Sequence, residues 1–359
     1  MLNVKIPVNT LSFGHVGLSI LHEAYKDNQD VRLLVNGGTD ISAYSYSKEF
    51  LDWLSAAALN SKENVNFSDV GFNLWHLDGC ENRMGVNQNL LTFHETSELT
   101  KTEANFARQQ NNVFVTSRYT QSVFKNAGVD ASYLPLGFDS THFKNLKTAH
   151  SPSHDGTIVF GVFGKFEKRK HTEEVISAWN SKYGGKRGFK LNTHVYNPFF
   201  SPEQNSTLLA RSVDGNKPWN INPIPFVKTL AELNGCFNAC DVVIDMSGGE
   251  GFSIPSFSAT ALGKHAVLQN FSSLSDWGPD SGAIMVPAAP MQDVYDGHFF
   301  VQGREFNQGQ IAGFNKDDFL SACDEAVKRA TVGPNEQGKY LQTKWTWEET
   351  WKNLKHNLK

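Results

Sequence analysis

The sequence has little of what secreted, membrane-spanning or nucleic-acid-binding proteins carry. Only four cysteines occur in 359 residues, without the paired CxxC spacing or the density of a disulfide-stabilised chain. The net charge is −4, so no strong positive field attracts nucleic acid or an anionic membrane. No apolar run is long enough to span a bilayer, and the first residues lack the charged and apolar regions of a signal peptide. We therefore expect a protein of the reducing cytoplasm.

The length and apolar content suit two domains of ordinary size. Short apolar runs alternate with helical patterns throughout, which predicts α/β domains with parallel sheets. The polar segment Lys144–Gly156 separates two such halves, so we place one domain at 1–145 and a second at 156–343. We expect a terminal helix at 344–359 that packs back toward the first domain. Two doubly wound, Rossmann-like domains would leave a ligand cleft between them, at the carboxyl ends of both sheets. The expected strands are Asn3–Pro7, Val31–Val35, Gly71–Leu77, Asn89–Thr92, Val113–Thr116, Ser132–Leu136, Thr157–Phe163, Lys190–Val195, Ile221–Pro225, Val242–Asp245 and Ala266–Gln269.

The most informative stretch is a glycine-rich turn just after the expected strand Val242–Asp245. It runs from Gly248 to Pro255 and carries one carboxylate, Glu250. A helix then begins with the proline in its first turn, where proline is tolerated, and stops at Gly263. Backbone N–H groups and the positive end of the helix dipole would face the cleft beside this acid. The combination suits a ligand with both hydroxyl and phosphate groups, such as a phosphorylated sugar.

A second segment places four cations in six positions at the end of the first strand of the second half. Gly164 precedes Lys165, and Lys168, Arg169 and Lys170 follow just before a helix. This disposition favours an anion. We assign Lys165 and Lys170 to that role because the glycine lets the backbone come close and both side chains can reach the same cleft. Lys168 is expected on the solvated surface, and the pattern leaves Arg169 undecided.

In order and spacing these motifs resemble those of the family-4 retaining glycosyltransferases, which have the GT-B architecture. The family's phosphate motif reads Gly-Arg, four spacers and Lys, and its later motif reads Glu, seven spacers and Glu. Gly164-Lys165 and Lys170 match the first motif with lysine in place of arginine, and Glu250 opens the second. Ser258 stands where the family has its second glutamate, which commonly holds the ribose of the nucleotide.

The resemblance covers roughly residues 110–359 and extends to Trp347-Glu348 in the terminal helix. It implies retaining transfer of a hexosyl or pentosyl group from a nucleoside-diphosphate sugar to a hydroxyl acceptor, with no cofactor and no metal. The chain has no Asp-x-Asp motif, so protein cations are expected to replace a metal at the diphosphate.

The resemblance also implies site residues. His94 matches a histidine near the reacting carbon, and the turn Phe13–Gly17 matches a glycine loop that faces the ligands. Main-chain atoms near Phe226 and Val227 are expected to bind the base. The catalytic candidates are His94, Lys165, Lys170 and Glu250. The donor-binding candidates are Gly14, Gly17, Gly164, Arg169, Phe226, Val227, Gly249, Gly251, Phe252, Ser253 and Ser258.

Three alternatives stay open. The acceptor, otherwise a glycan or a small molecule, could be a modified DNA base, although the acidic charge balance disfavours it. The same scaffold could serve a nucleotide-sugar epimerase or a phosphorolytic enzyme. The departures at Lys165 and Ser258 also permit a degenerate protein that binds sugar nucleotides without turnover. The sequence does not determine the sugar, the base or the acceptor. It does not determine the oligomeric state either.

Overall fold

The computed structural model describes residues 1–63, 65–146, 156–214 and 218–358. The chain divides into two compact units. Unit 1 comprises residues 1–142, 301–309 and 345–359, and unit 2 comprises residues 143–300 and 310–344. Residues 147–155, most of the segment expected as a linker, lie outside the described residues. Residues 301–309, which the sequence analysis placed in the second domain, cluster with unit 1.

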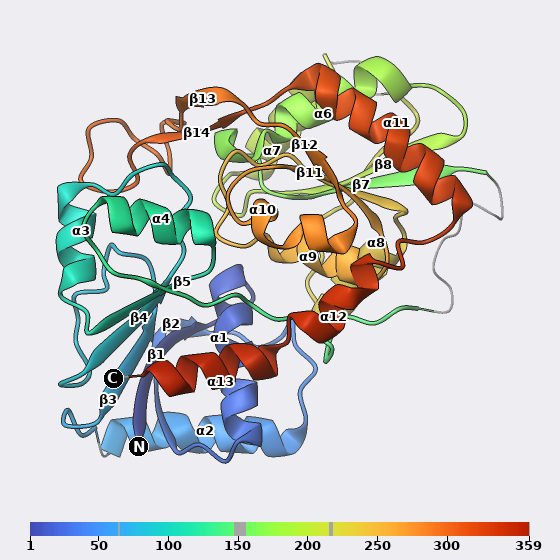
Figure 1. Ribbon diagram of the computed structural model, residues 1–359. Coiled ribbons are helices and arrows are strands. Elements are labelled where there is room, and N and C mark those ends of the chain that lie inside the picture. Colours follow the sequence, from blue (N-terminus) through green and yellow to red (C-terminus); the bar gives the residue numbers. More distant parts are fainter. Residues whose placement is uncertain (64, 147–155, 215–217, 359) are drawn as a thin grey trace. The chain divides into compact units, whose positions relative to one another are not determined.

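Unit 1 is a parallel sheet with helices on its faces (Figure 1). Its strand order is β2-β1-β3-β4-β5-β6, and every pair of neighbours is parallel. Its elements are β1 (Leu2–Val8), α1 (Ser12–Lys26), β2 (Val31–Thr39), α2 (Lys48–Glu63), β3 (Val70–Leu74), β4 (Gln88–Thr92), α3 (Lys101–Arg108), β5 (Asn112–Val115), α4 (Arg118–Asn126), β6 (Ser132–Tyr133) and α13 (Trp347–Asn357).

The C-terminal helix α13 belongs to unit 1 and packs on α1. Trp347, Trp351 and Leu354 are buried, so their near-helical spacing is the packing face. The indole of Trp351 donates to Asp27 Oδ2 at 2.9 Å, and Thr350 Oγ1 donates to the carbonyl of Pro135 at 2.8 Å. Helix α13 is thus tied to the residue that follows α1 and to the segment that follows β6.

Unit 2 is a second parallel sheet of order β12-β11-β10-β7-β8-β9 with an added antiparallel pair, β13-β14. Figure 1 shows α6, α7 and α11 over one face of this sheet and α8 and α9 on the other. Its elements are β7 (Ile158–Gly164), the 3₁₀ turn η1 (Lys168–Lys170), α6 (Thr172–Tyr183), β8 (Phe189–Val195), α7 (Pro202–Ser212), β9 (Ile221–Pro223), α8 (Leu230–Asn238), β10 (Val242–Asp245), α9 (Ile254–Ala261), β11 (His265–Gln269), α10 (Leu274–Trp277), η2 (Pro279–Ser281), β12 (Ile284–Val286), β13 (Ala289–Asp293), β14 (Gln310–Gly313), α11 (Lys316–Val332), η3 (Gly338–Tyr340) and α12 (Leu341–Lys344).

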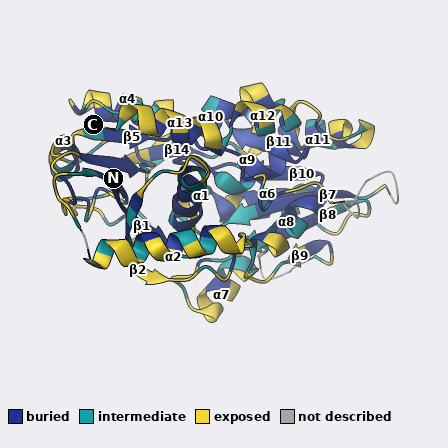
Figure 2. Ribbon diagram, turned by 90° about the horizontal axis from the view of Figure 1, so that it is seen from below, coloured by how far each residue is buried: buried dark blue, intermediate teal, exposed yellow. Residues whose placement is uncertain are grey.

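The predicted fold class, two Rossmann-like α/β domains and a C-terminal helix, is confirmed, and each expected strand is present within a few residues of its limits. Strands covered on both faces read as continuous apolar runs, as β10 does. The central strands are accordingly drawn as buried in Figure 2. The short strands β12, β13 and β14 were not predicted from the sequence. No helix among the described residues is both long and apolar enough to cross a membrane.

Candidate functional site

The candidate site of unit 2 lies where its strand order changes direction. Counted from β7 as the first strand, the sheet has the order 3-2-1-4-5-6, and strands one and four are β7 and β10. In sheets of this kind ligands bind outside the carboxyl ends of the strands at that point. The loop after β7 carries the four cations, and the loop after β10 carries Glu250. The topology therefore brings together two motifs that are about 80 residues apart.

The backbone of the first loop is shaped by Gly164 and His171. Gly164 has φ +140°, a conformation that strongly favours glycine. A Cβ atom there would lie 3.3 Å from Cδ of Lys170, so this side chain folds back over the glycine. His171 adopts φ +50° between η1 and α6 and is fully buried, with Nε2 2.8 Å from the carbonyl of Ala312.

The second loop is held from three sides. The N–H of Gly248 donates to the carbonyl of Arg169 at 2.7 Å, and the N–H of Ala312 on β14 donates to the carbonyl of Gly248 at 2.9 Å. A Cβ at Gly248 would lie 2.2 Å from the Ala312 oxygen, so only glycine fits between these backbones. The N–H of Glu250 donates to Ser272 Oγ at 3.0 Å. The loop therefore presents its carboxylate on a backbone that has little freedom.

Five charged side chains from the two loops form one connected network, which we call the ion cluster: Lys165, Glu167, Arg169, Lys170 and Glu250. Arg169 Nη1 donates to Glu250 Oε1 at 2.9 Å and to the carbonyl of Gly249 at 2.8 Å, and Arg169 Nε lies 3.0 Å from Glu167 Oε2. Lys170 Nζ forms an ion pair with Glu250 Oε1. Lys165 Nζ lies 3.4 Å from Glu167 Oε1. Three cations and two carboxylates give the ion cluster a net charge of +1, which suits an anion.

Opposite charges within the ion cluster shift one another's pKa values toward the ionised forms. Burial alone would raise the pKa of Glu250, but the neighbouring Lys170 and Arg169 outweigh it and hold the pKa at about 2. Burial likewise opposes ionisation of Glu167, and Arg169, Lys165 and Lys170 keep its pKa below the ordinary value. For Lys170 burial disfavours the charged form, whereas Glu250 raises the pKa above the usual value. Both carboxylates and Lys170 are therefore charged at neutral pH.

The structure brings together most of the candidates that the sequence places in this half of the chain. Six of them belong to the ion cluster or adjoin it: Gly164, Lys165, Arg169, Lys170, Gly249 and Glu250. Gly251 follows directly in the chain. Arg169, undecided from the pattern alone, contacts both carboxylates. Glu167 was missed, although it is the one acid among the four cations in 165–170. A single acid among four cations could have indicated this role, because a buried carboxylate next to cations pairs with them.

Three candidates in the second loop and in α9 are buried within the protein. The ring of Phe252 packs 4.9 Å from that of Phe257, and its carbonyl accepts from the indole of Trp277 at 3.2 Å. The hydroxyl of Ser253 binds the carboxylate of Asp245 at the end of β10. Ser258 is 2% exposed within α9, and a contact of its hydroxyl with the donor stays a prediction.

Phe226 and Val227 follow β9, at the same edge of the sheet. Phe226 is 46% exposed, and the centre of its ring lies 5.5 Å from that of Tyr196. The N–H of Val227 lies 3.4 Å from His194 Nε2 and is already engaged there. Base binding through these main-chain atoms stays a prediction.

The candidates of unit 1 have structural partners of their own. Gly14 and Gly17 lie in the first turns of α1, not in an open loop, and a Cβ would come within 2.0 Å of Asn9 O and 2.8 Å of Ile6 Cδ1, respectively. The close approach that these glycines permit is thus to the chain's own β1 segment. Ligand binding beside these two glycines stays a prediction. His94 is buried, with Nε2 3.0 Å from both Thr96 Oγ1 and the carbonyl of Glu98, and its catalytic role stays a prediction.

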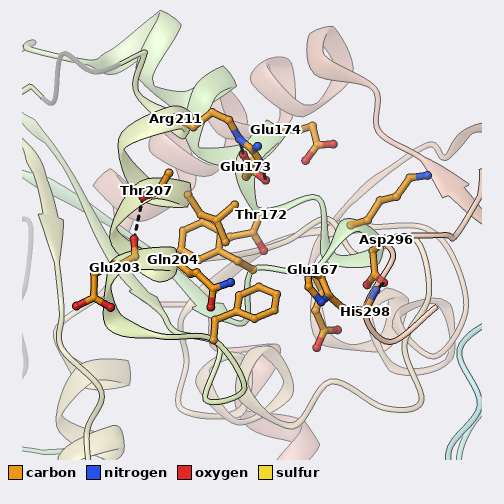
Figure 3. A pocket seen from close by; sticks show the side chains of 14 residues that line it. Glu167, Thr172, Glu173, Glu174, Glu203, Gln204, Thr207, Arg211, Asp296 and His298 are labelled. Carbon is orange, nitrogen blue, oxygen red and sulfur yellow. Dashed lines mark hydrogen bonds and ion pairs between the residues drawn. The ribbon is translucent and has the colours of Figure 1, made fainter. Parts of the chain in front are cut away.

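A cavity of about 610 Å³ is lined in part by Glu167 and lies between α6, α7 and the turn that follows β13 (Figure 3). Its charged groups are largely paired: Glu173 binds Arg211 through two contacts of 2.5 Å, and Asp296 accepts the N–H groups of its own turn. Five acids against one lysine and one arginine make its lining unsuited to a diphosphate. Among the described residues, no group of three or more His, Cys, Asp or Glu side chains is arranged to hold a metal ion.

Comparison with protein-family profiles and with curated proteins finds no match. Solved structures do match. Sucrose-phosphate synthase from Thermosynechococcus elongatus has a TM-score of 0.68 and 10% identity, covering 99% of this chain and 97% of that chain. HepE from Anabaena, in complex with UDP-glucose, has a TM-score of 0.66 and 13% identity, covering 99% of this chain and 98% of that chain. WaaG, a glycosyltransferase involved in lipopolysaccharide biosynthesis, has a TM-score of 0.63 and 8% identity, covering 100% of this chain and 99% of that chain.

At such low identity these likenesses establish the fold. The chain has the GT-B fold, the architecture of these glycosyltransferase structures.

Proposed function

We propose that the protein transfers a sugar from a nucleoside-diphosphate sugar to a hydroxyl acceptor, with retention of the anomeric configuration and without a metal. The observation that carries the proposal is the ion cluster at the strand-order switch of unit 2. There Lys165, Arg169 and Lys170 stand beside Glu250 at the carboxyl ends of β7 and β10. The likeness in fold to glycosyltransferases supports it.

In the proposed reaction the bond between the anomeric carbon and the diphosphate oxygen breaks, and its electron pair leaves with the diphosphate. The acceptor oxygen forms the new bond to that carbon, and its proton passes to the departing phosphate oxygen. Negative charge therefore develops on the diphosphate, where Lys165, Arg169 and Lys170 stabilise it. Fixed cations in a site of low dielectric are an effective way to do this.

Glu250 would orient the hydroxyls of the donor sugar. Its contacts with Arg169 and Lys170 use Oε1, and we assign Oε2 to a sugar hydroxyl. A carboxylate accepts short, charge-assisted hydrogen bonds from such groups. Ser258 is buried in α9, and we assign the main contacts with the nucleotide to the three cations at its diphosphate.

A thermal-shift screen against UDP-, GDP- and ADP-sugars, starting with UDP-glucose, tests donor binding, because a ligand that binds the native state raises the apparent stability. Release of the nucleoside diphosphate with acceptors then tests transfer, and the anomeric configuration of the product tests retention. Unchanged turnover in excess EDTA is expected. Absence of a shift with every donor, or inversion in the product, would contradict the proposal.

A second candidate is a protein that binds sugar nucleotides without turnover. It is favoured by the engagement of Glu250 with two cations and by the burial of Ser258. Binding of a donor without transfer to any acceptor, and with no slow hydrolysis, would favour this candidate.

A further inference from the structure

Lys165 differs from the other cations of the ion cluster. Its side chain is 35% exposed, against 9% for Arg169 and 15% for Lys170. Those two side chains bind Glu250, whereas Lys165 contacts Glu167 at 3.4 Å. Its Nζ also lies 5.3 Å from the centre of the Phe199 ring and 5.9 Å from that of Phe299. Lys165 is therefore the most accessible cation of the ion cluster and has two aromatic neighbours.

The loop that carries Phe199 is fixed to the segment that carries Lys165. Asn197 follows β8 and is fully buried, and its Nδ2 donates to the carbonyl of Phe166 at 3.1 Å. Its Oδ1 accepts the N–H of Phe199 at 3.1 Å, and its own N–H donates to Asn205 at 2.7 Å. These bonds fix the backbone of the loop at Phe199, a residue that is 61% exposed and whose ring lies next to Lys165.

The loop that carries Phe299 is fixed in the same way. Asp296 Oδ1 accepts the N–H groups of His298, Phe299 and Phe300 at 2.8 to 3.0 Å. Lys168 Nζ donates to the carbonyl of Tyr295 at 3.3 Å, which links this turn to the Lys165 segment. The rings of Phe199 and Phe299 meet edge to face, 5.3 Å apart. Figure 3 shows Asp296 and His298 of this turn beside Glu167.

We infer that Phe199 and Phe299 are positioning residues that hold the Lys165 ammonium group for the diphosphate of the ligand. The inference rests on the proposed function. A lysine has a flexible four-carbon stem and a compact charge, whereas arginine presents a planar fork. Two ring faces and the Glu167 carboxylate restrict the ammonium group to one region. The aromatic pair therefore preorganises a cation that lacks the geometry of arginine.

Pyrophosphate affinity, measured by calorimetry, tests the effect on ligand binding. Phe199→Leu and Phe299→Leu keep an apolar side chain but lose the ring, and each is expected to weaken binding about two- to fivefold, the range that a cation–π contact supplies. Phe199→Tyr retains the ring and should bind as the wild type does. Trp219→Leu removes another exposed aromatic ring of unit 2 and serves as the matched control.

A double-mutant cycle separates positioning from a general structural effect. In a Lys165→Met background, Phe199→Leu should cause no further loss, because the cation on which the ring acts is absent. An equal loss in both backgrounds would overturn the inference, as would wild-type affinity in both leucine variants.

A spectroscopic readout makes the test independent of the proposed function. After reductive ¹³C-methylation, which keeps the charge, the methyl resonance missing from Lys165→Met identifies Lys165. In the wild type it should be shifted by the rings, and the shift should shrink in Phe199→Leu and in Phe299→Leu. An unshifted wild-type resonance would overturn the aromatic contact itself. A shifted resonance that pyrophosphate and every nucleoside diphosphate leave unmoved would instead contradict the anion site of the proposed function.

Discussion

The guanidinium of Arg169 donates to the carboxylate of Glu250 at 2.9 Å, and both side chains are more than nine-tenths buried. The two residues are 81 positions apart and lie on the loops after β7 and β10. Removing one partner of a buried ion pair leaves the other charge uncompensated and destabilises a protein strongly. Stability and the proposed anion binding should therefore depend on the same contacts.

Glu250 should make stability pH-dependent. Its folded pKa of about 2 is below the ordinary value of 4.5, so ionised Glu250 stabilises the fold above about pH 4.5 and this stabilisation is lost as the pH falls toward 2. The gap corresponds to about 3 kcal/mol of unfolding free energy. Urea unfolding between pH 6 and pH 3 should show a steeper loss in the wild type than in Glu250→Gln. Parallel curves for the two proteins would contradict the assignment.

Lys170 should matter for turnover more than its neighbours on the surface. Replacing it by methionine removes a cation that faces the proposed diphosphate, and the loss of one such group typically lowers turnover on the order of 10²–10³-fold. Exposed Lys186, in the same unit, provides the control Lys186→Met. Steady-state kinetics with a donor found by the thermal-shift screen measure the turnover of both variants. Near-wild-type turnover in Lys170→Met would remove this residue from the proposed site.

Gly164 should couple backbone strain to the ion cluster. Gly164→Ala introduces a Cβ at φ +140° and 3.3 Å from Lys170 Cδ. Gly185→Ala introduces one at φ +70° with nothing within 4 Å. Gly185→Ala should destabilise the fold by about 1–2 kcal/mol and Gly164→Ala by about 1–3 kcal/mol, but only Gly164→Ala should also weaken pyrophosphate binding. Equal pyrophosphate affinity in the two variants would show that Lys170 does not depend on the glycine.

The C-terminal helix should contribute to the stability of unit 1. Leu354 is fully buried, and Leu354→Ala should lower the unfolding free energy by about 2–5 kcal/mol through the cavity it leaves. Lys352→Ala changes an exposed position of the same helix and should have little effect. Denaturant unfolding of the two variants provides the comparison. Equal stability would mean that α13 is not an integral part of this unit.

The fold and the location of the candidate site followed from local features of the sequence. Apolar runs bounded by polar turns define the parallel strands, and the motifs at Gly164 and Gly248 stand directly at strand ends. Because the carboxyl ends of parallel strands share one edge of a sheet, two loops far apart in the chain could be expected to meet there.

The pairing of charges was decided by the tertiary structure. Four cations next to each other look alike in the sequence, yet Arg169 and Lys170 bind Glu250, Lys165 lies against Phe199 and Phe299, and the carboxylate of Glu167 joins two of them. Likewise, Gly14 and Gly17 proved to fit α1 against β1, and residues 301–309 joined unit 1. Strand and turn preferences act over a few neighbouring residues and can be read from the sequence. Which side chain meets which depends on distances of a few ångströms between segments that only the folded chain brings together.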